Sequence, residues 1–156
     1  MTSFAILIVV WVGLFRVRSS STLLIFFNLP STFLHELSHW LVALITSSSP
    51  GFPSVWPRRS PGGWQLGSVK FRPKAWSAGW VALAPLVLLG PLSVWGLVRW
   101  EPETWAQAWL GGVFFAYTAW GSIPSLTDWV IALKYPLGTI QVLVLLALVA
   151  GVFTGA

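Results

Sequence analysis

Long stretches without charge are the feature that most restricts what this chain can fold into. Residues 75–98, 104–127 and 135–156 contain no Lys, Arg, Asp or Glu, and residues 19–57 contain only Glu36. Each stretch can supply the roughly 20 apolar residues that a transmembrane helix needs. The chain is 8% charged, whereas a soluble domain is about 25% charged. We therefore predict an integral membrane protein that crosses the bilayer several times.

The predicted fold is an all-α polytopic membrane protein with about four to five transmembrane helices, in a single domain over residues 1–156. Proline residues mark where these helices bend or begin. Pro30 predicts either a kink or the first turn of a new helix, and Pro85 and Pro91 predict kinks in the third span. The predicted spans are residues 2–16, 21–46, 77–98, 104–123 and 137–154.

The segment between the second and third spans, residues 47–76, is too polar to continue either of them. It contains the turn-forming sequence "RRSPGG", after which Val69 and Phe71 alternate with basic residues. This pattern predicts a β-hairpin or one exposed strand near residues 64–72. A strand edge exposed to lipid would leave backbone groups unpaired, so we expect it at the membrane surface or in a protein-lined cavity.

The positive charge of the chain is concentrated in the same segment. The net charge is +5, and five of the nine basic residues lie there: Arg58, Arg59, Lys70, Arg72 and Lys74. Such a cluster is typical of a cytoplasmic loop beside anionic lipid headgroups. We therefore expect the lipid bilayer, and not nucleic acid, as its partner. The expected location is a multi-pass position in an inner or plasma membrane, with residues 47–76 in the cytoplasm.

Three polar side chains interrupt the second apolar stretch. The sequence "HELSH" places His35, Glu36 and His39 in the pattern H-E-x-x-H. Residues four apart share one face of a helix, so both imidazoles can bind one metal ion, and Glu36 can act as a general base. The alternative is a hydrogen-bonded cluster between helices without metal. A charged residue at mid-bilayer costs at least about 2.5–3.5 kcal/mol, so these side chains need partners in either case.

The third ligand of such a site is predicted by elimination. Catalytic zinc usually has three protein ligands, but the chain has no Cys and no His outside the motif. Glu101 and Glu103 lie in a short polar connection and are interpreted as solvated charges. Asp128 lies between apolar stretches, where a carboxylate needs a partner, and is the remaining candidate. Its alternative role is to cap a helix that begins near Ser125.

These motifs together resemble the site-2 protease family of intramembrane zinc metalloproteases. The family core has three transmembrane helices, the first and third of which carry the zinc ligands, and residues 21–134 resemble that core. The resemblance implies one Zn²⁺ per chain, held by His35, His39 and Asp128, with Glu36 as the base. The second family motif, N-x-x-P-x-x-P-L-D-G, is matched only in part: "SIPSLTDW" keeps one proline and the aspartate.

The resemblance implies hydrolysis of a peptide bond in or near a transmembrane segment of a membrane protein or peptide substrate. A helical substrate hides its carbonyls in hydrogen bonds, so it must unwind before it is cleaved. We expect the strand near residues 64–72 to bind it in extended form, through Gly67, Ser68 and Val69. Two alternatives stay open: a non-catalytic zinc-bound membrane scaffold or chaperone, and a membrane zinc hydrolase of a non-peptide substrate.

Overall fold

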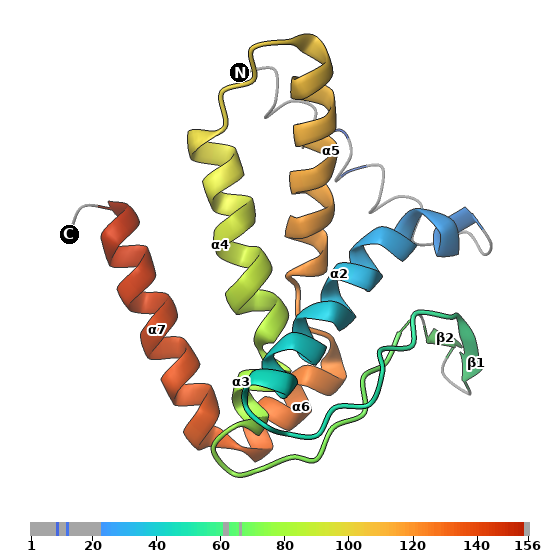
Figure 1. Ribbon diagram of the computed structural model, residues 1–156, viewed down its shortest axis with the longest axis vertical. Coiled ribbons are helices and arrows are strands. Elements are labelled where there is room, and N and C mark those ends of the chain that lie inside the picture. The colour runs from blue at the N-terminus through green and yellow to red at the C-terminus, as the bar shows by residue number, and fades with distance from the viewer. Residues whose placement is uncertain (1–8, 10–11, 13–22, 61–62, 66, 155–156) are drawn as a thin grey trace.

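The computed structural model describes residues 9, 12, 23–60, 63–65 and 67–154 (Figure 1). The described chain is mostly helical, and its longer helices follow the predicted spans. They are α2 (Leu23–Ile45), α3 (Ala78–Ala82), α4 (Ala84–Arg99), α5 (Trp105–Gly121), α6 (Leu126–Lys134) and α7 (Pro136–Thr154). Two short strands, β1 (Arg58–Ser60) and β2 (Gly63–Gln65), lie between α2 and α3. The predicted first span, residues 2–16, lies almost wholly outside the described residues.

Helices α4 and α5 run side by side, and α2 packs across both near the end of the molecule where α3 and α6 lie (Figure 1). Small residues allow this close approach. A Cβ atom on Gly121, at the end of α5, would lie only 2.9 Å from the Ser31 carbonyl oxygen of α2. A Cβ atom on Gly96 would overlap the Phe115 ring between α4 and α5. The crossing brings the middle of α2 close to the ends of α3, α5 and α6.

Only one of the three prolines expected to bend or start a helix interrupts one. Helix α3 ends at Ala82 and α4 begins at Ala84, next to Pro85. Proline lacks the N–H of a helical hydrogen bond, and its ring crowds the preceding turn. Pro91 lies within α4 and Pro30 within α2, and both helices continue through them. No new helix begins at Pro30, and the break predicted for the third span is confined to Pro85.

The segment between α2 and α3 folds back on itself as an irregular hairpin. Strands β1 and β2 pair antiparallel, and Ser54 and Ser68 exchange two backbone hydrogen bonds of 3.0 and 2.9 Å. The Arg72 N–H donates to the Ser48 carbonyl (2.8 Å), which closes the base of the hairpin beside the end of α2. The regular strand expected near residues 64–72 is therefore shorter, because β2 covers only Gly63–Gln65. The chain that follows β2 is extended and pairs intermittently.

Helix α7 meets α6 at a sharp bend and packs on α3 through backbone contact. A Cβ atom on Gly138 would lie 2.5 Å from the Trp76 carbonyl oxygen, so glycine is required for this approach. The buried core at this end joins Ala82, Leu83, Ala132 and Val142. Helix α7 lies apart from α4 (Figure 1). Within the described residues no helix by itself is long and apolar enough to be a candidate membrane span, whereas α6 and α7, bent by 109°, qualify as a pair.

Candidate metal centre

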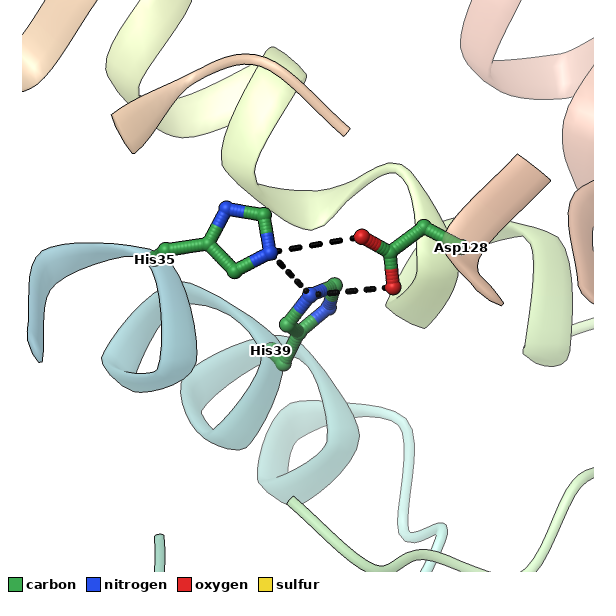
Figure 2. Close-up of side chains that lie close together, drawn as sticks. All are labelled: His35, His39 and Asp128. Atoms are coloured by element: carbon green, nitrogen blue, oxygen red, sulfur yellow. Dashed lines mark hydrogen bonds and ion pairs between the residues drawn. The ribbon is translucent and has the colours of Figure 1, made fainter. Parts of the chain in front are cut away.

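His35 and His39 of α2 meet Asp128 of α6, although about ninety residues separate them in sequence (Figure 2). One ligand atom from each residue lies within 4.8 Å of the others. The His35 Nε2 atom is 3.3 Å from Asp128 Oδ2, and the His39 Nε2 atom is 3.3 Å from Asp128 Oδ1. The two Nε2 atoms are 3.0 Å apart. The three residues predicted as metal ligands therefore converge on one point.

A backbone carbonyl lies beside the Nδ1 atom of each histidine and orients its ring. The His35 Nδ1 atom lies 2.8 Å from the Gly121 carbonyl oxygen, and the His39 Nδ1 atom lies 2.6 Å from the Val81 carbonyl oxygen. A carbonyl can only accept a hydrogen bond, so the proton of each neutral ring must be on Nδ1. Each Nε2 atom then presents a lone pair towards Asp128. This is the usual outer-shell arrangement of a metal-binding histidine.

The donor set can also hold a metal ion. With both protons on Nδ1, two nitrogen lone pairs and a carboxylate face one another without a donor between them. Two donor atoms bound at about 2.0–2.1 Å to one tetrahedral ion lie about 3.3–3.4 Å apart, close to the 3.0–3.3 Å separations here. Among the described residues that line the surrounding cavity, none is Lys or Arg. A bound cation would satisfy all three groups and balance the buried carboxylate charge.

Asp128 also caps α6. Its Oδ2 atom accepts from the Ser125 N–H (2.7 Å), and the Ser125 Oγ atom accepts from the Asp128 N–H (3.2 Å). This reciprocal pair is a capping box, which satisfies two N–H groups at the start of the helix. The two interpretations of Asp128 weighed from the sequence are therefore compatible. The cap fixes the carboxylate at the helix start, where it faces both histidines.

Glu36 lies in the same cavity but outside the group of three ligands. It is buried, and the cavity of about 370 Å³ that it lines also contains His35, His39 and Asp128. The extended chain after β2 forms another wall, with Gly67, Ser68 and Val69 among the lining residues. A Cβ atom on Gly67 would lie 2.5 Å from Glu36 Oε1, so the chain passes directly against this carboxylate. All residues predicted to bind substrate thus lie beside the candidate metal centre.

Several features of the site were not identified from the sequence. The carbonyls of Val81 and Gly121 carry no signature of their own, because every residue has a carbonyl. Trp120, Ile123 and Ile131 line the cavity and give it an apolar wall. Apolar residues are so frequent in this chain that composition could not single these three out. Only the arrangement of α2, α5, α6 and their connections around the cavity selects them.

No protein-family model, no curated protein and no solved structure matches the chain. The interpretation of the site therefore rests on the chain's own residues and their geometry. That geometry defines a class: a mostly helical protein with a buried group of two histidines and one aspartate that can hold a metal ion.

Proposed function

We propose that the chain is an integral membrane zinc metalloprotease of the site-2 protease type. Its reaction is the hydrolysis of a peptide bond in or near a transmembrane segment of a membrane protein substrate. The observation that carries the proposal is the convergence of His35, His39 and Asp128 in a cavity that also contains Glu36. An extended, partly paired chain segment lies against that cavity, as binding of an extended peptide requires.

The donor set supports zinc as the metal. Imidazole ligands suit zinc and other transition metals, whereas magnesium and calcium prefer oxygen ligands. Catalytic zinc sites commonly use three protein ligands and leave one position open. His35, His39 and Asp128 would hold the ion, which when bound supplies the Lewis acidity that activates water and polarises a carbonyl.

Glu36 is the proposed general base. It follows His35 directly in the helix, lines the cavity and is not one of the three grouped ligands. Its carboxylate can accept a proton from the attacking water and then donate it to the amine that leaves when the C–N bond breaks. A non-catalytic zinc-bound scaffold would not require a second buried carboxylate at this position. The presence of Glu36 in the cavity therefore favours an enzyme over the scaffold alternative.

The extended segment beside Glu36 is the proposed binding edge for the substrate. The N–H and C=O groups of Ser68 are both bonded to Ser54. Successive residues of an extended chain direct these groups to opposite edges, so those of Gly67 and Val69 are directed away from Ser54. A peptide could add to this second edge as a strand, which would unwind it and align one carbonyl with the site. This edge favours a peptide substrate over a non-peptide one.

The distribution of polar and apolar residues on α2 supports a location within the bilayer. The polar residues Asn28, Ser31, Glu36, Ser38 and His39 are buried. Large apolar residues of the same helix are exposed: Phe27, Phe33, Leu41, Leu44 and Ile45. Water-soluble proteins bury apolar residues preferentially, and ionisable residues within a membrane face the protein interior. We expect a multi-pass protein of an inner or plasma membrane, with residues 47–76 on the cytoplasmic side, that stays in the membrane pellet after alkaline extraction.

The proposed chemistry is tested by a pair of matched substitutions. Glu36→Gln removes the base, and Glu101→Gln makes the same change in the exposed connection between α4 and α5. We expect both variants and the wild type to hold about one zinc ion per chain. Cleavage of single-span membrane peptides should fall about 10²–10⁴-fold in Glu36→Gln only.

Each contrary outcome points to one alternative. Undiminished cleavage by Glu36→Gln would remove Glu36 from the mechanism. A zinc-loaded wild type that cleaves no peptide but hydrolyses a lipid or prenylated substrate would favour the non-peptide hydrolase. A zinc-loaded wild type inactive on both would favour the scaffold.

A further inference from the structure

Thr32 of α2 carries a hydroxyl that forms no hydrogen bond to another described residue. The side chain is half-buried and lines the same cavity as His35, Glu36 and His39. We propose that Thr32 is a substrate-binding residue, whose hydroxyl forms a hydrogen bond with the backbone of the bound peptide. This inference rests on the proposed function, because it places a peptide in the cavity, but it concerns binding and not hydrolysis.

Thr32 differs from the other described hydroxyls that lie beyond the first turn of a helix. Such a hydroxyl usually donates to the carbonyl three or four residues before it. Four of them do so here at 2.7–2.9 Å: Ser31, Ser38, Ser93 and Thr118. Thr127 also lines the cavity without such a bond, but it is the second residue of α6, where no helical carbonyl precedes it. Thr32 is therefore the exception, since α2 is continuous on both sides of it.

The neighbouring Ser31 occupies an acceptor that Thr32 would otherwise use. The Asn28 carbonyl lies four residues before Thr32 and accepts the Thr32 N–H as part of the helix. The Ser31 hydroxyl donates to the same oxygen at 2.9 Å. A carbonyl oxygen has two lone pairs, so both are then in use. The Thr32 hydroxyl keeps its donor and its acceptor capacity for a partner outside α2.

Thr32 lies within reach of a peptide bound at the metal centre. It precedes His35 by three residues and Glu36 by four, so it lies on the same side of α2, one helical turn or about 5.4 Å along the axis. An extended chain advances about 3.3 Å per residue. A peptide whose scissile carbonyl lies at the metal centre therefore has backbone groups only one or two residues away that can reach Thr32.

A peptide bound as a strand needs a partner of this kind. The edge formed by Gly67 and Val69 can pair with only one side of the added strand, because successive residues direct their N–H and C=O groups to opposite sides. Groups on the other side would lose water in a partly apolar cavity, which is unfavourable without a new hydrogen bond. The Thr32 hydroxyl can donate to a carbonyl or accept from an N–H on that side.

The experiment measures how tightly the full chain binds a labelled single-span membrane peptide. The background is Glu36→Gln, so that the peptide is held and not cut. Three changes are added singly: Thr32→Val removes the hydroxyl at nearly constant volume, Thr32→Ser keeps it, and Thr118→Val is the matched control. Thr118 is fully buried in α5, outside the cavity lining, and donates to the Phe115 carbonyl. Zinc content is measured in every variant, and cleavage is measured separately in the wild type.

We expect Thr32→Val to weaken peptide binding about 2–10-fold, which is the usual effect of losing one hydrogen bond, without a change in zinc content. Thr32→Ser and Thr118→Val should bind the peptide as the background does. Unchanged binding in Thr32→Val would overturn the proposal. An equal loss in Thr32→Ser would also overturn it, because the methyl group and not the hydroxyl would then be responsible.

Peptides that each carry one backbone ester identify the group that Thr32 binds. An ester lacks the N–H and has a weaker acceptor carbonyl, so at the bonded position it should cost more binding in the background than in Thr32→Val. Equal costs in both proteins at every position would overturn the proposal. Binding with the expected pattern but no cleavage by the wild type would overturn the proposed hydrolysis and leave the role of Thr32 supported. A background protein that binds no peptide would overturn both.

Discussion

Helices α2 and α7 are both long and apolar, yet they differ in which residues they bury and which they expose. Helix α2 buries its polar residues and exposes large apolar ones. Helix α7 exposes apolar residues along its outer half: Leu143, Val144, Leu148 and Val152. Only one side of α7 near its start is buried, through Val142 and the close contact at Gly138. The comparison separates a helix that carries two of the three candidate metal ligands from one that contributes mainly packing.

This difference predicts how substitutions should rank. On α2, the buried polar residues have specific partners, such as His39 with Val81 and Asp128. Removing one of them leaves the other groups unpaired in a cavity. On α7, an exposed apolar residue has few partners to lose. Effects on metal binding should therefore come from α2, whereas α7 should affect stability alone, and only through its buried side.

The largest expected effect is the loss of metal from α2. His39→Ala removes a ligand and leaves Asp128 and His35 without their partner, so bound zinc should fall from about one ion per chain to almost none. The matched change on α7 is Gln141→Ala, which removes a polar residue that accepts from Trp80 Nε1. Metal analysis should find wild-type zinc in Gln141→Ala. Full zinc content in His39→Ala would show that α2 is not the metal-binding helix.

A smaller effect is expected where the hairpin segment meets α2. Gly67→Ala would place a Cβ atom 2.5 Å from Glu36 Oε1, so the Glu36 carboxylate, the proposed base, must move. Because small displacements of catalytic groups can cost up to about 100-fold in rate, turnover should fall while zinc content stays unchanged. Gly51→Ala, in the same hairpin, meets only ordinary contacts at 3.6 Å or more and serves as the control. Equal turnover in the two variants would argue against the contact between Gly67 and Glu36.

The smallest expected effect is a change in stability that differs between the buried and the exposed side of α7. Val142 is fully buried and Val144 is 54% exposed, so the same change to alanine tests burial alone. Val142→Ala should lower the free energy of unfolding by about 1–3 kcal/mol, through lost contacts and a residual cavity. Val144→Ala should change it by less than about 0.5 kcal/mol. Denaturant titration in detergent measures both, and equal losses would mean that the exposed side of α7 is also packed.

The sequence predicted the helices of this fold better than their ends and connections. Long stretches that are mostly apolar and almost free of charge locate α2, α4, α5 and α7, because each is long enough to form a helix of about 20 residues. The effects of individual prolines were not predictable, since Pro85 and Pro91 have the same chemistry, yet the helix is interrupted next to Pro85 and continues through Pro91. The short extent of β2 depends on the partner strand, which no local pattern encodes.

The candidate site was more predictable than the fold around it. His35, Glu36 and His39 follow a spacing that places them on neighbouring faces of one helix, and Asp128 followed by elimination because acids are so few. The carbonyls of Val81 and Gly121 could not be foreseen, because their role depends on α3 and α5 ending beside α2.

The most direct test of the central claim is zinc X-ray absorption on the purified full-length chain. We predict bound zinc with two imidazole nitrogens and a carboxylate oxygen at about 2.0–2.1 Å. Imidazole scattering from two rings would identify His35 and His39, because the chain has no other histidine. Absence of bound metal, or a spectrum without histidine ligands, would contradict the claim that α2 and α6 together form a metal centre.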